Sequence, residues 1–180
     1  MKTCKNKCFK NNKKTFKKLV KNFNLKKCVA LLQPDKSINN NNVYGVVEFQ
    51  QKSKYLFIKY DIKNLKDGLH GFHIHKNGDL TKGCISACEH FNPYNKNHGC
   101  LNSKESHAGD LGNIKSKKNI SKGTIKTNKI SLIKDKINII GRMIIVHENQ
   151  DDCGKGNDAE SFKTGNAGKR LACGVIGIKN

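Results

Sequence analysis

The sequence predicts an all-β domain of about eight antiparallel strands, folded as a sandwich or a barrel. The main observation is that, from Cys28 onward, apolar and polar residues alternate in short runs of strand length. Polar turn-forming stretches such as S-I-N-N-N-N separate these runs, and this part of the sequence has no convincing helical pattern. With 180 residues, the chain fits one domain of ordinary size.

Eight runs have the pattern of strands. They lie at 28–33, 43–50, 54–62, 68–75, 122–127, 129–133, 141–148 and 171–178. Two long segments, 76–108 and 149–169, interrupt the rhythm. Loops of this length inside a compact domain are usually functional or tied down. We therefore expect both to be functional loops held by metal or disulfide.

Residues 1–26 differ in composition and are predicted to be a basic N-terminal extension to a domain at 27–180. They contain no acidic residue, and the spacing of Phe16, Leu19, Val20 and Phe23 allows a short amphipathic helix. Neither the apolar run of a secretory signal nor a transmembrane segment is visible in the sequence. A cytoplasmic location is the expectation that follows.

The formal net charge is +21, from 35 basic and 14 acidic residues, and only Arg142 and Arg170 are arginines. Lysines spread along a whole chain usually form a solvated surface, which is the interpretation we favour. The alternative is a surface that binds nucleic acid or another polyanion.

Eight cysteines are many for this length. They are compatible with a secreted disulfide framework, with metal ligands or with a mixture of the two. Eight cysteines allow 105 pairings, so their spacing does not decide among these. Cys4 and Cys8 have no histidine nearby and are expected to be free thiols.

Histidine is concentrated in one part of the chain. Six of the seven histidines lie between His70 and Asp110, and the seventh is His147, at the end of another apolar run. His73 and His75 are two apart in a predicted strand, so both imidazoles lie on one face, while Phe72 and Ile74 face the core. This concentration, with an aspartate at its end, indicates a metal site.

Several motifs around these histidines resemble those of the copper/zinc superoxide dismutases, in register from about Gly68 to Ile178. They are G-F-H-I-H, G-C-x-S-A-x-x-H-F-N-P, H-x-G-D-L-G-N, G-R-x-x-x-V-H-E-x-x-D-D and G-N-A-G-x-R-L-A-C-G-V-I-G-I. The resemblance implies an eight-stranded Greek-key barrel or sandwich with one copper and one zinc ion per subunit. It implies that superoxide is converted to oxygen and hydrogen peroxide while copper is alternately reduced and reoxidised.

The same resemblance implies two ligand sets that share one histidine. The copper ligands are His73, His75, His90 and His147. The zinc ligands are His90, His98, His107 and Asp110, so that His90 bridges the two ions. The donor chemistry agrees, because four nitrogens suit Cu(II), and three nitrogens with a carboxylate suit zinc.

Other roles are also implied by the resemblance. Asp151 fixes His73 and His98 by hydrogen bonds, and His70 is a packing residue. Arg170 holds the superoxide anion, and His90 supplies a proton. Lys163 and Glu160 shape the field that guides the substrate. Cys84 and Cys173 form a disulfide; Cys28, Cys88, Cys100 and Cys153 receive no partner.

A set of glycines and apolar residues resembles the dimer-forming patch of the family, so a homodimer is expected. The set is Gly78, Ile140, Gly141, Val175, Gly177 and Ile178. One rival interpretation is a copper chaperone with a dismutase-like domain; the complete ligand set disfavours it. A second is a basic nucleic-acid-binding protein with an idle metal site, for which a steep salt dependence of DNA binding would be evidence.

Overall fold

The computed structural model describes residues 26–180. Apart from Lys26, the predicted extension, with its possible helix and with Cys4 and Cys8, lies outside the described residues. The strands are β1 (Lys27–Pro34), β2 (Tyr44–Lys52), β3 (Tyr55–Lys63), β4 (Gly68–His75), β5 (Thr81–Cys84), β6 (Asp110–Ser116), β7 (Ile120–Thr127), β8 (Met143–His147), β9 (Arg170–Val175) and β10 (Gly177–Ile178). Short helical turns occur at Ile85–Ala87 (η1), Asp135–Ile137 (η2) and Ser161–Thr164 (α2).

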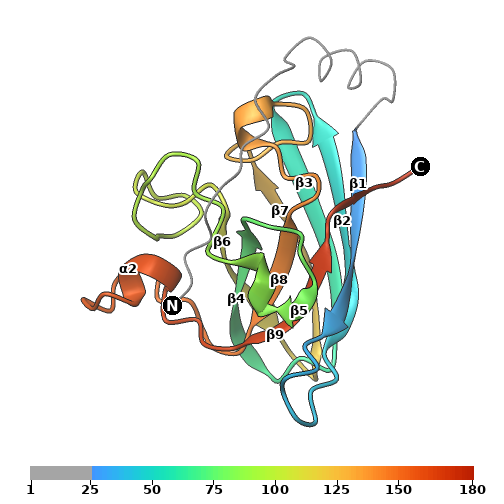
Figure 1. Cartoon of the computed structure of the whole chain (residues 1–180), viewed down its shortest axis with the longest axis vertical. Coiled ribbons are helices and arrows are strands. Elements are labelled where there is room, and N and C mark those ends of the chain that lie inside the picture. Colours follow the sequence, from blue (N-terminus) through green and yellow to red (C-terminus); the bar gives the residue numbers. More distant parts are fainter. Residues whose placement is uncertain (1–25) are drawn as a thin grey trace.

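Eight of these strands form one antiparallel sheet, in the order β6-β4-β8-β9-β1-β2-β3-β7, and β10 pairs with β1. The two end strands, β6 and β7, are consecutive in the chain and meet at a tight turn with a backbone bridge between Lys117 and Ile120. The sheet therefore curls into a nearly closed barrel (Figure 1). The predicted fold class, an all-β Greek-key barrel, is confirmed.

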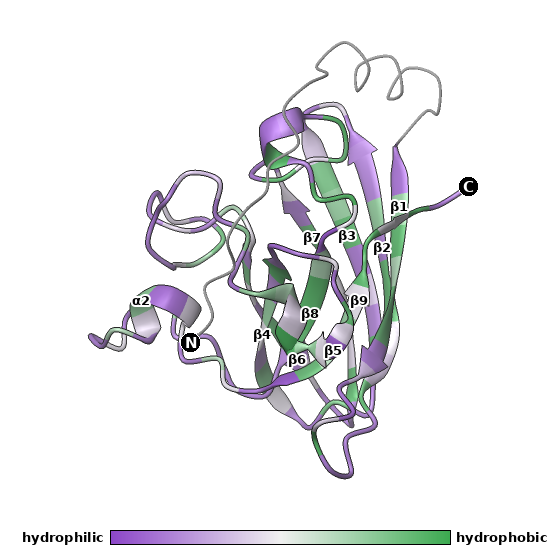
Figure 2. Cartoon of the chain, in the orientation of Figure 1, coloured by the Kyte–Doolittle hydropathy of each residue, from purple (hydrophilic) through white to green (hydrophobic). Residues whose placement is uncertain are grey.

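The core is formed by side chains that alternate between the inside and the outside of the barrel along each strand. Along β2, Val47 and Phe49 are buried while the residues between and beside them face outward, and Figure 2 shows the same alternation of hydrophobic and hydrophilic residues along the strands. On β4 the pattern changes: every residue from His70 to His75 is buried. Phe72 and Ile74 join the apolar core, while His73 and His75 face the opposite side, as predicted.

One predicted strand is absent from the structure, and one observed strand was not predicted. The segment 129–133 is not a strand: only Ser131 makes a backbone bridge, with Asn138. Its alternating Ile130 and Leu132 are buried in the core, while the Ser131 hydroxyl donates a hydrogen bond to Gln51 Oε1 (3.0 Å). The eighth strand of the barrel is instead β6, which the sequence analysis did not assign.

The two long loops contain little regular structure. The first, 76–109, includes only β5 and η1, and the second, 148–169, includes only α2. A disulfide between Cys84 and Cys173 attaches the first loop to β9. None of the helices between residues 26 and 180 is both long and apolar enough to cross a membrane.

Candidate metal centre

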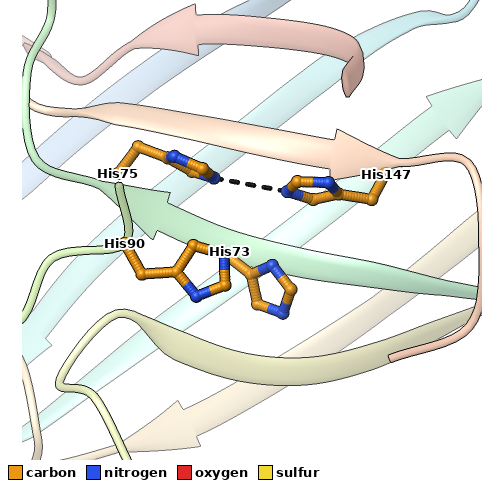
Figure 3. Close-up of side chains that lie close together, drawn as sticks. All are labelled: His73, His75, His90 and His147. Carbon is orange, nitrogen blue, oxygen red and sulfur yellow. Dashed lines mark hydrogen bonds between the residues drawn. The ribbon is translucent and has the colours of Figure 1, made fainter. Parts of the chain in front are cut away.

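Two neighbouring strands carry three of the four predicted copper ligands: His73 and His75 on β4, and His147 on β8. β4 pairs with β8 so that His75 lies opposite Met143 and Phe72 opposite Val146, which brings His147 alongside His73. His90 follows η1 and reaches the same place through a backbone bridge with His75. Figure 3 shows the four imidazoles of His73, His75, His90 and His147 gathered on one side of β4.

These four histidines form a compact set of nitrogens. All four side chains are at most 3% exposed. One ring nitrogen from each lies within 4.8 Å of those of the others, and the Nε2 atoms of His75 and His147 are 3.3 Å apart. Four neutral imidazole nitrogens in such a group are a donor set that suits copper.

The outward nitrogens of three of these rings are already engaged. His73 Nε2 donates to Asp151 Oδ2 (2.9 Å), and His75 Nδ1 donates to the Cys88 carbonyl (2.8 Å). His147 Nδ1 donates to the Gly168 carbonyl (3.3 Å). Because a neutral imidazole has one N–H, these bonds leave the inward nitrogens with free lone pairs.

A second group lies beside the first. Asp110 Oδ1 is 2.9 Å from His90 Nδ1, 3.1 Å from His107 Nδ1 and 3.1 Å from His98 Nδ1. The other carboxylate oxygen, Oδ2, accepts the backbone N–H groups of His107 (2.8 Å) and Gly99 (3.1 Å), which fixes the carboxylate. Three nitrogens and one carboxylate oxygen are a typical zinc donor set.

His90 belongs to both groups, with Nδ1 facing Asp110 and Nε2 facing the copper-type set. Two buried ring nitrogens, His73 Nδ1 and His90 Nε2, have no hydrogen-bond partner within the described residues, and a third, His98 Nδ1, has only its close contact with Asp110 Oδ1 (3.1 Å). Buried polar atoms are rarely left unsatisfied. All three lie in the two groups, so the residues present fit two metal ions joined through His90.

Electrostatics keep these groups in metal-binding protonation states. Burial, together with neighbouring His73, lowers the pKa of His90 to about 3, and burial also places the pKa of His75 and His147 well below the ordinary value. Burial alone would raise the pKa of the Asp110 carboxyl, but hydrogen bonds from His107, His90 and His98 hold it far below its ordinary value. The rings of His75, His90 and His147 are thus neutral and the Asp110 carboxylate is ionised. His98 is the exception: burial lowers its pKa, but hydrogen bonds to Asp110 and Asp151 raise it to about 9, so a metal ion there must displace a proton.

Asp151 connects the two groups. Besides accepting from His73, its Oδ1 accepts a hydrogen bond from His98 Nε2 (2.7 Å). Its backbone is held in turn by Asn113, whose side chain bonds both Asp151 N and Asp151 O. Gly165, at φ +68°, packs against this carboxylate so closely that a Cβ would lie 2.1 Å from Asp151 Oδ1. Only glycine fits there.

Arg170 lies at the edge of the copper-type group. Its guanidinium donates to the carbonyls of Cys84 (2.8 Å) and Cys88 (2.7 Å). The Cys88 carbonyl also accepts a hydrogen bond from His75 Nδ1, so one oxygen atom links Arg170 to a copper-type ligand. Arg170 and Gly168 line an open groove of about 770 Å³, and Gly168 is also the partner of His147. Lys169 and Arg170 bring positive charge to this groove and Asp35 brings one carboxylate, while none of the histidines lines it.

Asp35 is a part of this surrounding that the sequence analysis missed. Its carboxylate is buried and accepts a hydrogen bond from the backbone N–H of Cys84 (3.2 Å), and the carbonyl of the same residue accepts from Arg170.

The other predicted residues lie outside the two groups. Glu160 and Lys163 are exposed on and beside α2; the Glu160 carboxylate accepts a hydrogen bond from the Thr164 hydroxyl, and neither residue lines the groove at Arg170. His70 lies outside both groups, with ring nitrogens 2.9 and 2.8 Å from the carbonyls of His147 and Lys66.

Comparison with known proteins bears on these groups directly. The family model described as copper/zinc superoxide dismutase (SODC) matches residues 43–176. The chain belongs to the copper/zinc superoxide dismutase family. A Kluyveromyces lactis protein named as a Cu-Zn superoxide dismutase is 51% identical over 156 residues, covering 84% of this chain and 97% of the relative.

Two further proteins are also similar to this chain. A Brugia pahangi protein named as an extracellular Cu-Zn superoxide dismutase is 46% identical over 153 residues, or 83% of this chain and 75% of the relative. The crystal structure of the clock protein EA4 superposes with a TM-score of 0.78 at 40% identity, covering 86% of this chain and 95% of that chain. This dismutase is thus an oxidoreductase acting on superoxide, with copper and zinc as the family cofactors.

A second disulfide of this dismutase was not predicted. It joins Cys100 in the first long loop to Cys153 in the second. No sequence signal could select it, because pairings of eight cysteines are not resolved by spacing. Cys28 is a buried free thiol on β1, and burial raises its pKa to about 11.

Proposed function

We propose that His73, His75, His90 and His147 hold the copper ion on which superoxide reacts, and that His90, His98, His107 and Asp110 hold the zinc ion. The observation that supports this proposal is that the buried nitrogens His73 Nδ1 and His90 Nε2 have no hydrogen-bond partner, while His98 Nδ1 has only its contact with Asp110, and all three belong to the two groups. When bound there, copper would supply the one-electron chemistry, and zinc would supply a fixed charge without redox change.

The chain's own residues supply binding and proton transfer. Arg170 is fixed by backbone carbonyls and keeps its charge, so it attracts and orients the superoxide anion. His90 is the proton carrier in this proposal, because its Nε2 faces the copper-type set and makes no hydrogen bond there; whenever Nε2 does not hold copper it could take a proton from water and pass it to the reduced substrate. Asp151 keeps the rings of His73 and His98 in register with the two ions. Lys163 and Glu160 are proposed to shape the longer-range field.

Superoxide consumption by the fully metallated protein tests the assignment. His147→Ala should abolish consumption while the β-sheet circular dichroism is retained. The matched control is His70→Gln, which replaces a buried histidine outside both groups and should leave metal content and turnover intact. Retained turnover in His147→Ala would refute the copper assignment.

We also propose a homodimer formed through one patch. Gly78 packs against Gly141 so tightly that a Cβ would lie 2.1 Å from the Gly141 carbonyl oxygen and 3.1 Å from Val175 Cγ1. Ile178 is 54% exposed at the other end of this surface. An Ile178→Lys substitution places like charges across a two-fold interface and should shift sedimentation towards the monomer. Leu31→Lys, at a position on β1 that is 60% exposed, is the control and should leave the dimer intact.

We propose that the protein is located in the cytoplasm of the cell. Its support is the polar, lysine-rich composition of residues 1–26. Since one relative is named as extracellular, cell fractionation with an antibody to the folded domain is the test. Recovery of the protein from the medium would overturn the proposal.

A further inference from the structure

We propose that the Cys100–Cys153 disulfide is a positioning element of the zinc site, which holds the two long loops together and slows the loss of zinc. This inference rests on the proposed zinc assignment. It extends that assignment to two cysteines that touch neither ion and that lie at a separate place from the Cys84–Cys173 bond.

The disulfide lies at matched positions on the two loops. Cys100 is two residues after His98, and Cys153 is two residues after Asp151. His98 and Asp151 are themselves joined by a 2.7 Å hydrogen bond. The covalent bond therefore closes a small ring, running from His98 to Cys100, across to Cys153, and back through Asp151 to His98.

Backbone groups inside this ring hold the zinc donors directly. The N–H of Gly99, between His98 and Cys100, donates to Asp110 Oδ2 (3.1 Å). The N–H of Cys153 donates to Asp151 Oδ1 (2.7 Å), the same oxygen that accepts from His98. If the loops separate at the disulfide, these amides move, and both His98 and Asp110 lose part of the support that orients them.

Few other contacts join the loops at this point. His98 N donates to the Phe162 carbonyl (2.8 Å), and Gly154, at φ +75°, packs against the His98 carbonyl, where a Cβ would lie 2.6 Å from the oxygen. Figure 1 shows α2 and the neighbouring first loop projecting together from one side of the barrel, away from the paired strands. Segments with few buried contacts open easily, so a covalent link there has a large effect.

The Cys84–Cys173 and Cys100–Cys153 disulfides differ in exposure. Cys84 and Cys173 are buried, whereas Cys100 and Cys153 are partly exposed. A Cα–Cα distance of 4.7 Å between Cys100 and Cys153 lies within the range that disulfides adopt. A mild, water-soluble phosphine should therefore open Cys100–Cys153 before Cys84–Cys173, which makes a test possible in the unmutated protein.

The first test compares zinc transfer to a chromogenic chelator from the full-length, metallated wild type and from the Cys100→Ser/Cys153→Ser double variant. Loss of a partner that orients metal ligands typically costs about 10- to 100-fold in metal affinity, and we expect an acceleration of this size. Cys28→Ala is the control for thiol removal, since Cys28 is buried on β1, and it should release zinc at the wild-type rate. Equal rates in the double variant and the wild type would overturn the proposal.

A second arm does not depend on the folding of a variant. Wild type treated with the phosphine, then alkylated and mapped by mass spectrometry, should release zinc faster in step with modification of Cys100 and Cys153. Amide hydrogen exchange should rise at Gly99 and Cys153 and stay unchanged in β2 and β3. Free thiols at both positions in the untreated protein, or zinc release independent of their modification, would overturn the inference. Failure of the wild type to bind zinc would instead overturn the underlying zinc assignment.

Discussion

Asp151→Asn isolates the connection between the two metal groups. The wild-type carboxylate accepts from His73 Nε2 at 2.9 Å and from His98 Nε2 at 2.7 Å. The single carbonyl oxygen of asparagine can accept from one ring, and its NH₂ group then faces the N–H of the other. A buried donor left without a partner costs about 1–3 kcal/mol. At about 1.4 kcal/mol per tenfold change, zinc affinity should fall by about 10- to 100-fold.

Competition with a chelator of known zinc affinity measures this loss. Asp152→Asn is the matched control, because Asp152 is the next residue and accepts from Gly154 N and the Ser161 hydroxyl but from no histidine. Its zinc affinity should stay within about twofold of the wild type, as for other changes that leave the orienting bonds of the ligands in place. Unchanged affinity in Asp151→Asn, or equal losses in both variants, would refute the role given to Asp151.

Three further predictions concern other parts of the molecule. Arg170→Gln should lower the second-order rate constant for superoxide by about tenfold or more and weaken its dependence on ionic strength; an unchanged rate measured by pulse radiolysis would contradict the role of the groove. Leu132→Ala should cost about 2–5 kcal/mol in urea unfolding because Leu132 is fully buried, whereas the exposed neighbour Ile133→Ala should cost little; equal costs would contradict this packing. Burial lowers the pKa of His98, but hydrogen bonds to Asp110 and Asp151 outweigh it and raise that pKa to about 9, so zinc must displace a proton below pH 9. Zinc affinity measured by calorimetry should therefore rise about tenfold per pH unit from pH 6 to 8, with proton release; a flat profile would contradict it.

The sequence predicted the parts of the fold that depend on local alternation. β1 and β2 alternate buried and more exposed side chains, and the face shared by His73 and His75 follows from the same two-residue period of a strand. β8, M-I-I-V-H, is buried at every residue and was predicted as a strand from a continuous apolar run. The segment 129–133 has the same pattern but folds as a loop, because Ile130 and Leu132 are buried without pairing to a strand. Alternating apolar and polar residues indicate that one face of a segment is buried, but they do not indicate whether a neighbouring strand pairs with that segment.

β6 was missed for the opposite reason. Its sequence, D-L-G-N-I-K-S, begins with a predicted zinc ligand and contains a glycine at φ +77°, so it gives a weak strand signal. Its pairing with β4 from Gly68 to His73 is a long-range effect. The support given by Asp35 and the Cys100–Cys153 bond also arise only when distant loops meet, which no local pattern contains.

The central claim is that two unlike ions share His90. Anomalous X-ray diffraction from crystals of the fully metallated protein, collected on both sides of the copper and zinc absorption edges, tests it most directly. We expect one copper peak among His73, His75, His90 and His147 and one zinc peak among His90, His98, His107 and Asp110. A single peak, or two peaks that do not both contact His90, would contradict it.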